Sequence, residues 1–114
     1  MKVNTYTRSG GKNEILTYIE GLPNKERIET TIALSKIERD GLKALEVLNT
    51  RQLEKKLWEI KLSKNRFMYV VADEDNLYVV NACRKQKGKA EKFELEKAKK
   101  RVRELEEKLG KKFL

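Results

Sequence analysis

Three strand-like runs in the middle of the chain constrain its fold more than any other feature. In Lys56–Leu62, apolar residues at every second position alternate with Glu59 and Lys61, which is the pattern of a strand with one buried face. Asn65–Ala72 is rich in aromatic and β-branched residues, and Leu77–Cys83 follows it after an acidic turn. Connections as short as these predict an antiparallel meander.

Helical patterns lie on both sides of these strands. Asn13 and Asn24 are each suited to cap a helix, and Gly41 is suited to end the second one. Ala90–Leu109 carries an apolar stripe at spacings of three and four residues, which predicts a long amphipathic helix with charged, solvated outer faces. A weaker alternation over Lys2–Thr7 predicts an N-terminal strand.

This order of elements predicts an α+β fold, in which an N-terminal strand and a helical hairpin pack on a small antiparallel sheet, with a long C-terminal helix. Residues 42–54 contain scattered leucines without a regular pattern, so we expect an irregular connection there. With the helices on one side of the sheet, the other face stays partly open, and Glu59 and Lys61 are expected to point toward it. One proline and no repeats or linkers predict a single domain over residues 1–114.

Charge and residue types limit the function. A net charge of +9 on 114 residues favours a polyanionic partner, either nucleic acid or an acidic protein. The chain has no histidine, so any catalysis must use carboxylates, Lys, Arg or Tyr. Cys83 is the single cysteine, which excludes an internal disulfide and, without histidine, a zinc site of the usual kind. We expect Cys83 and Trp58 to pack in the core, and no metal or cofactor to be required.

The sequence predicts a cytoplasmic protein that does not contact membranes. No apolar run approaches the roughly 20 residues needed to span a bilayer. The N-terminus, MKVNTYTRSGG, lacks the apolar stretch of a signal peptide. A lone cysteine fits a reducing compartment.

Basic residues form two groups at the ends of the predicted strands. Across an antiparallel meander the two groups can approach each other and form a concave surface that neutralises phosphates. The first group flanks the first two strands and comprises Lys55, Lys56, Lys61, Lys64 and Arg66. The second group follows the last strand and comprises Arg84, Lys85, Lys87, Lys89 and Lys92.

The run LWEIKLSKNRFMYVV, followed by LYVVNACRKQKGKA and a charged helix, resembles the RelE/ParE superfamily of type II toxin–antitoxin toxins, and most of all its phage-derived HigB-like branch. The upstream order of a basic strand and two helices is similar too, so that the resemblance covers residues 3–107. It implies a RelE-like fold and a ribosome-dependent endoribonuclease (an mRNA interferase) that cuts messenger RNA in the A site of the 30S subunit. It also implies contacts with rRNA, and an acidic cognate antitoxin as a partner.

The resemblance further implies roles for individual residues. In this chemistry the RNA 2′-OH attacks the adjacent phosphate without a metal, while the protein accepts a proton, stabilises the phosphate charge and protonates the departing 5′-oxygen. Glu59 or Lys61 is the predicted general base, and Arg66 and Lys85 are predicted to stabilise the transition state. The remaining basic residues are predicted to bind RNA phosphates, and they are Lys55, Lys56, Lys64, Arg84, Lys87 and Lys89.

Several alternatives stay open. Glu59 could form a salt bridge to Arg66 or Lys61 that only orders the sheet. The whole chain could be a ParE-like inhibitor of DNA gyrase without RNase activity, or a non-catalytic nucleic-acid-binding relative. The chain also departs from the family because no Tyr or His follows the last strand, which leaves Lys85 or Lys87 as the candidate general acid.

Overall fold

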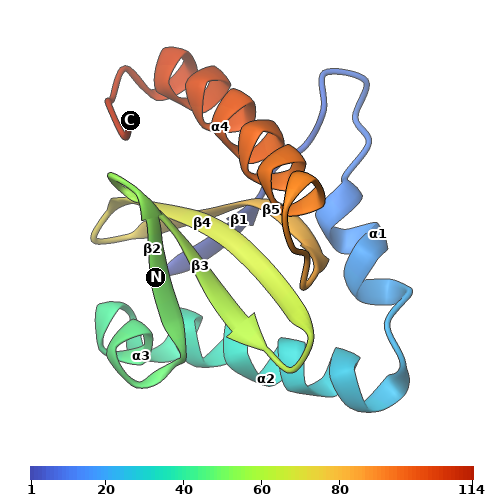
Figure 1. Ribbon diagram of the computed structural model, residues 1–114. Coiled ribbons are helices and arrows are strands. Elements are labelled where there is room, and N and C mark those ends of the chain that lie inside the picture. The colour runs from blue at the N-terminus through green and yellow to red at the C-terminus, as the bar shows by residue number, and fades with distance from the viewer.

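The computed structural model describes residues 1–114 and shows a five-stranded sheet with helices on both of its faces (Figure 1). The strands are β1 (Lys2–Thr5), β2 (Thr50–Glu54), β3 (Leu57–Leu62), β4 (Asn65–Asp73) and β5 (Asn76–Arg84). The helices are α1 (Glu14–Glu20), α2 (Asn24–Asp40), α3 (Leu42–Val47) and α4 (Lys89–Leu109). The strand order across the sheet is β1-β5-β4-β3-β2.

The sheet is mixed, whereas the sequence predicted a purely antiparallel one. β2, β3, β4 and β5 pair antiparallel in chain order, which confirms the predicted meander. β1, however, pairs parallel with β5, with Lys2 opposite Asn76. Parallel neighbours need a long crossover connection, and the chain between β1 and β5 provides it.

Residues 42–54 are regular, which corrects the irregular connection expected there. Leu42–Val47 forms α3, and Thr50–Glu54 forms the edge strand β2 beside β3. Both elements are short, and β2 exposes Arg51 and Gln52, so neither produces a clear hydrophobic pattern.

Helices cover both faces of the sheet, whereas the sequence predicted them on one side. The helices α1, α2 and α3 pack on one face, where Ile37 and Phe67 belong to the same core. α4 packs on the opposite face, where Val70 and Val102 belong to a second core (Figure 1). The reason is visible in β4, because residues 67–70 are all buried and a strand buried on both sides needs a cover on both sides.

The predicted helix boundaries are confirmed with one exception. Asn13 caps α1, and its Oδ1 accepts a hydrogen bond from the Leu16 N–H at 3.0 Å. Gly41 ends α2 with a φ of 64°. Asn24, however, is the first residue of α2 and not its cap, because Pro23 occupies the cap position. Among these helices, none combines the length and the apolar character needed to cross a membrane.

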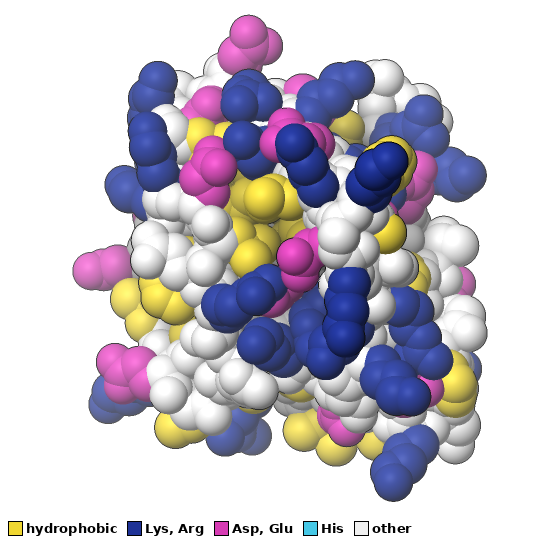
Figure 2. Space-filling view, in the orientation of Figure 1, with side chains coloured by type: hydrophobic (Ala, Val, Ile, Leu, Met, Phe, Trp, Pro, Cys, Tyr) yellow, Lys and Arg dark blue, Asp and Glu magenta, His cyan; other side chains and the backbone are white.

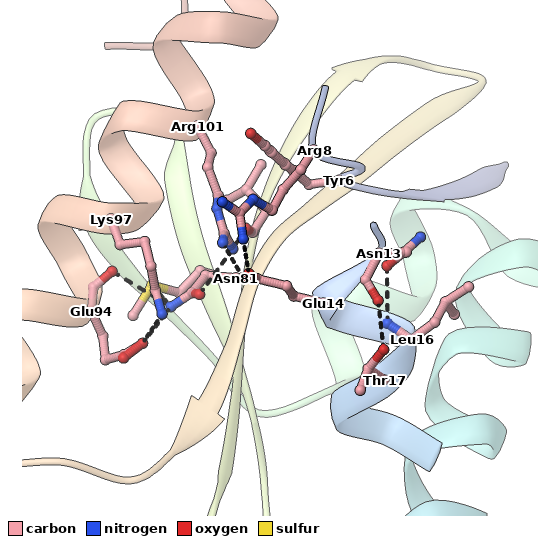
Figure 3. Close-up of polar contacts among 12 residues, drawn as sticks. Tyr6, Arg8, Asn13, Glu14, Leu16, Thr17, Asn81, Glu94, Lys97 and Arg101 are labelled. Atoms are coloured by element: carbon pink, nitrogen blue, oxygen red, sulfur yellow. Dashed lines mark hydrogen bonds and ion pairs between the residues drawn. The ribbon is translucent and has the colours of Figure 1, made fainter. Parts of the chain in front are cut away.

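A buried arginine ties α4 to the sheet and to α1, although the sequence predicted that all charged residues of this helix are solvated. Arg101 is 8% exposed and donates hydrogen bonds to the Val80 carbonyl oxygen at 2.9 Å and to Asn81 Oδ1 at 3.3 Å. It also pairs with the Glu14 carboxylate, and its guanidinium lies over the Tyr6 ring at 4.7 Å. Figure 3 shows Arg101 reaching from α4 toward Asn81 and Glu14. These contacts fix the position of α4 across β5.

Candidate nucleic-acid interface

α4 covers only part of its face of the sheet, and the uncovered part forms a basic hollow of about 240 Å³. The hollow has six basic and three acidic side chains in its lining. The basic ones are Arg51, Lys61, Arg66, Arg84, Lys85 and Lys87, and the acidic ones are Glu59, Glu91 and Glu94. Figure 2 shows Lys and Arg side chains gathered around the centre of the molecule, with Asp and Glu side chains between them.

Strand register places the floor residues next to one another. Lys61 of β3 lies opposite Arg66 of β4, and Arg66 lies opposite Cys83 of β5. In the neighbouring row, Glu59 lies opposite both Arg51 of β2 and Met68 of β4. Successive side chains alternate between the faces of a strand, so this register directs both rows to the face that carries α4.

Glu59 is the most deeply buried charged residue of the hollow, with 2% of its surface exposed. Its Oε2 lies 2.8 Å from Arg51 Nη2, yet no donor is aligned with this oxygen for a hydrogen bond. The ion-pair partner of Glu59 is therefore Arg51, and not Arg66 or Lys61 as the structural alternative assumed. The pair joins the edge strand β2 to β3.

The guanidinium of Arg66 is occupied by the turn that connects β3 and β4. Its Nη1 donates hydrogen bonds to the carbonyl oxygens of Ser63 at 3.0 Å and Asn65 at 2.9 Å. Only Nη1 takes part in these bonds, so other N–H donors of Arg66 remain available to a ligand. Ser63 itself has a φ of 55°, and the two hydrogen bonds stabilise this tight turn.

Arg84 is held by residues of the opposite face. Its Nη1 pairs with Glu26 Oε1 of α2 at 2.5 Å and donates to Asn65 Oδ1 at 3.3 Å. The fully buried Asn65 also donates to Glu26 and accepts from the Tyr18 hydroxyl at 2.5 Å. Hydrogen bonds from Asn65 and Arg84 hold the pKa of the Glu26 carboxyl below its ordinary value. The predicted phosphate ligand Arg84 thus already has a protein partner.

The basic loop after β5 meets the turn before β4. The Lys85 N–H donates to the Lys64 carbonyl oxygen at 2.6 Å, which brings the two basic groups predicted from the sequence together. Lys85 and Lys87 line the hollow, whereas Lys64 and Lys89 do not. Lys89 is the exposed first residue of α4, which follows directly after the loop.

Lys55 and Lys56 lie apart from the other predicted phosphate ligands. They form the turn between β2 and β3, at the end of β3 that is remote from Lys61. There they line a separate groove together with Trp58 and Leu42. Trp58 is partly buried and packs against the first core, as predicted. The expected single basic surface therefore does not include Lys55 and Lys56.

Sequence reasoning missed three charged residues of the hollow. Arg51 lies in the segment without a recognisable pattern, and Glu91 and Glu94 lie on a helix whose charges were all assigned to solvent. Glu94 accepts a hydrogen bond from the buried Asn81 at 3.2 Å and pairs with Lys97 at 3.1 Å (Figure 3). The sequence did offer one signal for Glu91 and Glu94: they are three residues apart, directly after the basic loop, so they lie on one face of the helix that begins there.

Cys83 has the core character predicted for it, although it also reaches the hollow. The residue is 9% exposed and unpaired. Burial raises the pKa of its thiol to about 12, and the nearby Glu94 carboxylate acts in the same direction. No cluster of three or more Asp, Glu or Cys side chains is arranged to hold a metal ion.

The strand order, the helical layer of α1 to α3 and the C-terminal helix define a RelE-like α+β fold. The crystal structure of the archaeal RelE–RelB complex from Pyrococcus horikoshii OT3 contains a similar chain, with a TM-score of 0.57 and 12% sequence identity. The similarity covers 77% of this protein and 100% of that chain. At this identity the likeness concerns the fold alone, and it confirms the predicted RelE-like class.

The family itself is shown by sequence. The family model described as Phage derived protein Gp49-like (DUF891) matches residues 17–103, so the chain belongs to this family. The matched segment includes α2, the meander and most of α4. No curated protein matches the sequence significantly. The predicted phage-derived relationship is thus confirmed, and the narrower HigB-like assignment stays a prediction.

Proposed function

We propose that the protein is the toxin of a type II toxin–antitoxin pair and that it cleaves messenger RNA on the ribosome. The observation that carries this proposal is the convergence of Lys61, Arg66 and Lys85 on one hollow, beside a buried carboxylate. Three cations around a concave surface suit a phosphodiester, because each neutralises backbone charge and releases counterions.

The reaction uses the nucleophile that RNA carries. The 2′-oxygen attacks the adjacent phosphorus and loses its proton, the bond from phosphorus to the 5′-oxygen breaks, and that oxygen takes up a proton. Arg66 and Lys85 stabilise the negative charge that builds up on the phosphate. Glu59 and Lys61 are the two candidates for the proton acceptor, since both lie on the floor of the hollow.

The proton donor of this site is neither a Tyr nor a His. No Tyr lines the hollow, and the chain has no His. Lys85 and Lys87, on the loop after β5, are the candidates that remain in the lining of the hollow. A lysine donor is ordinarily protonated at neutral pH and is a weak acid, so it predicts a slow reaction.

The proposed partners follow from charge and fold. A net charge of +9 favours the rRNA of the 30S A site and an acidic antitoxin. The solved chain with the similar fold comes from a complex of RelE with RelB, which supports a protein partner for this chain as well. We place this activity in the cytoplasm, where translating ribosomes are found.

The test is translation of a reporter message with purified ribosomes and protein, followed by mapping of RNA ends. We expect cleavage that requires ribosomes, and we expect it to be lost in the double variant Lys61→Ala and Arg66→Ala. A matched control is the double variant Lys25→Ala and Arg103→Ala, which removes the same charge from exposed positions outside the hollow. Cleavage that survives the first pair contradicts the proposed site.

Two further measurements, of DNA supercoiling by gyrase and of RNA binding, separate the alternative functions if the RNA stays intact. Intact RNA together with blocked DNA supercoiling by gyrase identifies a ParE-like inhibitor. Intact RNA with normal supercoiling, but with retained RNA binding, identifies a non-catalytic relative.

A further inference from the structure

Arg51 differs from Arg66, Arg84 and Arg101, whose guanidinium groups are all held by hydrogen bonds. Arg66 donates to two backbone carbonyls, Arg84 donates to Glu26 and Asn65, and Arg101 donates to Val80 and Asn81. Arg51 makes only ion-pair contacts, and no hydrogen bond holds its guanidinium. Its planar set of N–H donors is therefore open to a ligand.

The position of Arg51 directs these donors into the hollow. It lies opposite Glu59 in the ladder of β2 and β3, on the face that carries Lys61. Its side chain is 47% exposed, whereas that of Glu59 is 2% exposed. Arg51 thus faces solvent, and Glu59 forms part of the floor of the hollow.

The buried Glu59 carboxylate depends on Arg51 for compensation of its charge, whereas the half-exposed Arg51 is also hydrated by solvent. A carboxylate at this depth loses most of its hydration, and this loss is costly unless a cation or hydrogen-bond donors compensate it. Arg51 Nη2 at 2.8 Å is the nearest compensation, and Oε2 has no aligned hydrogen-bond donor. The buried charge therefore draws the guanidinium toward the floor and restricts its rotamers.

A second carboxylate reaches Arg51 from above. Glu91 lies in the first turn of α4, its side chain is 54% exposed, and its Oε2 is 3.7 Å from Arg51 Nη2. At this distance and exposure the contact is weak, because water screens it. A phosphate, with two oxygens matched to a guanidinium, forms a stronger interaction than this one.

We propose that Arg51 is a further phosphate-binding residue of the hollow, that Glu59 positions it, and that Glu91 is the resting counter-charge which an RNA phosphate displaces. The proposal rests on the proposed function for the identity of the ligand as RNA. It gives Glu59 a positioning role.

Binding is measured first, with a short 2′-O-methyl RNA oligonucleotide, which cannot be cleaved because its 2′-oxygen is blocked. We expect Arg51→Ala to weaken binding about tenfold, since a charged hydrogen-bonding contact is lost. The slope of log affinity against log salt should fall by about 0.7, the value for one phosphate contact on a single strand. Arg51→Lys should restore the salt slope but only part of the affinity, because lysine lacks the planar fork.

Glu91 supplies the sharper test, because its removal is expected to improve binding. Glu91→Gln should tighten binding of the same oligonucleotide in wild type and should have no effect in Arg51→Ala. Glu96→Gln is the matched control, since Glu96 is equally exposed on the same helix and pairs with Lys99. Equal effects of Glu91→Gln and Glu96→Gln overturn the counter-charge role, because they show only a change in total charge.

The role of Glu59 is resolved by Glu59→Gln in a double-mutant cycle with Arg51→Ala. If Glu59 acts through Arg51, the double variant binds no more weakly than Arg51→Ala alone. In the single variant Glu59→Gln, KM for cleavage then rises, while the pH profile of kcat keeps its shape. If instead Glu59→Gln leaves binding unchanged and removes one limb of the pH profile, Glu59 is the proton acceptor and the positioning role is wrong.

Failure of this inference is distinguishable from failure of the proposed function. If wild type cleaves ribosome-bound message and Arg51→Ala matches it in binding and cleavage, the inference fails and the function stands. If wild type binds the oligonucleotide through Arg51 but never cleaves, the function fails and the phosphate contact stands. No RNA binding by wild type overturns both. Arg51→Ala removes the ion-pair partner of the buried Glu59 and is expected to lower the free energy of unfolding. Circular dichroism checks that the variant folds. If it does not, the double variant Arg51→Ala and Glu59→Gln, which leaves no buried charge unpaired, replaces it in the binding measurements.

Discussion

Lys61 and Arg66 lie directly opposite each other in the ladder of β3 and β4, so that two like charges share one cross-strand pair. Like charges at this position destabilise a sheet. The turn that joins the two strands offsets part of this cost, because Arg66 donates to the Ser63 carbonyl oxygen. The RNA phosphate of the proposed function would offset the rest of this cost when it binds.

Lys61→Gln is expected to stabilise the fold while it removes activity. Loss of the opposed charge should raise the free energy of unfolding by about 0.5 kcal/mol, measured by urea denaturation. Cleavage of ribosome-bound RNA should fall about a hundredfold or more, because a cation that stabilises the phosphate charge in the transition state is lost. Lys100→Gln, at an exposed position of α4, is the control for the change in net charge and should alter neither property. A less stable Lys61→Gln variant contradicts the argument.

Arg101→Ala is expected to lower the free energy of unfolding by about 3 kcal/mol, because it leaves buried acceptors without a donor and leaves Glu14 with only the exposed Arg8 as a cation. Arg103→Ala changes the same residue type two positions along α4, where the side chain is exposed, and should cost less than about 0.5 kcal/mol. Urea denaturation of both variants measures the difference. Equal losses show that only helix propensity changed.

Acid should weaken the attachment of α1 to α4. A hydrogen bond from Arg101 to the Glu14 carboxyl holds the pKa of this carboxyl below its ordinary value of 4.5, and Arg8 contributes in the same direction. A carboxyl with a depressed pKa stabilises the folded state above its ordinary pKa, and this stabilisation is lost as the pH falls through the depressed value.

The free energy of unfolding should therefore differ most between wild type and Glu14→Gln near neutral pH, and the difference should shrink in acid. Glu20→Gln, at an exposed position of α1 without an ion pair, should show no such pH dependence. A constant difference at all pH values rules out the ionised Glu14 as its source.

Cys83 is expected to resist alkylation in the folded protein even though it borders the hollow. Burial raises the pKa of its thiol to about 12, and the thiolate is the reactive form. At neutral pH, iodoacetamide should react about a thousandfold more slowly with the folded chain than with the chain unfolded in urea. Rapid labelling of the folded protein shows instead that the hollow opens as far as Cys83.

Hydrophobic periodicity in the sequence correctly predicted the strands and helices that have a regular apolar pattern. The alternation around Trp58 and Ile60 identified β3, and the stripe of Ala90–Leu109 identified α4 to within one residue. The same patterns give no partner for a strand, so the parallel pairing of Lys2–Thr5 with β5 was not predictable from them. Nor do they say on which face of the sheet a helix lies.

In the candidate site too, local patterns predicted some positions, whereas others depend on how the strands pair. Lys61, Arg66 and Lys85 were placed together because strand alternation and short turns fix their relative positions. Lys55 lies outside the hollow. Proximity in sequence to β3 does not say at which end of the strand a residue lies, and the contact of Lys55 with RNA stays a prediction. Arg51 was missed because its place in the hollow depends on its register with Glu59, which only the folded sheet determines.

The parallel pairing of β1 with β5 sets an order of assembly for a newly synthesised chain. Lys2 cannot find Asn76 until most of the chain has left the ribosomal exit tunnel, and closing so long a loop precedes any gain from the pairing. α4 comes later still, although it completes the second core and the rim of the hollow. The surface is therefore unfinished until α4 has emerged, so a protein proposed to cleave messenger RNA on the ribosome is expected to be inactive during that part of its own synthesis.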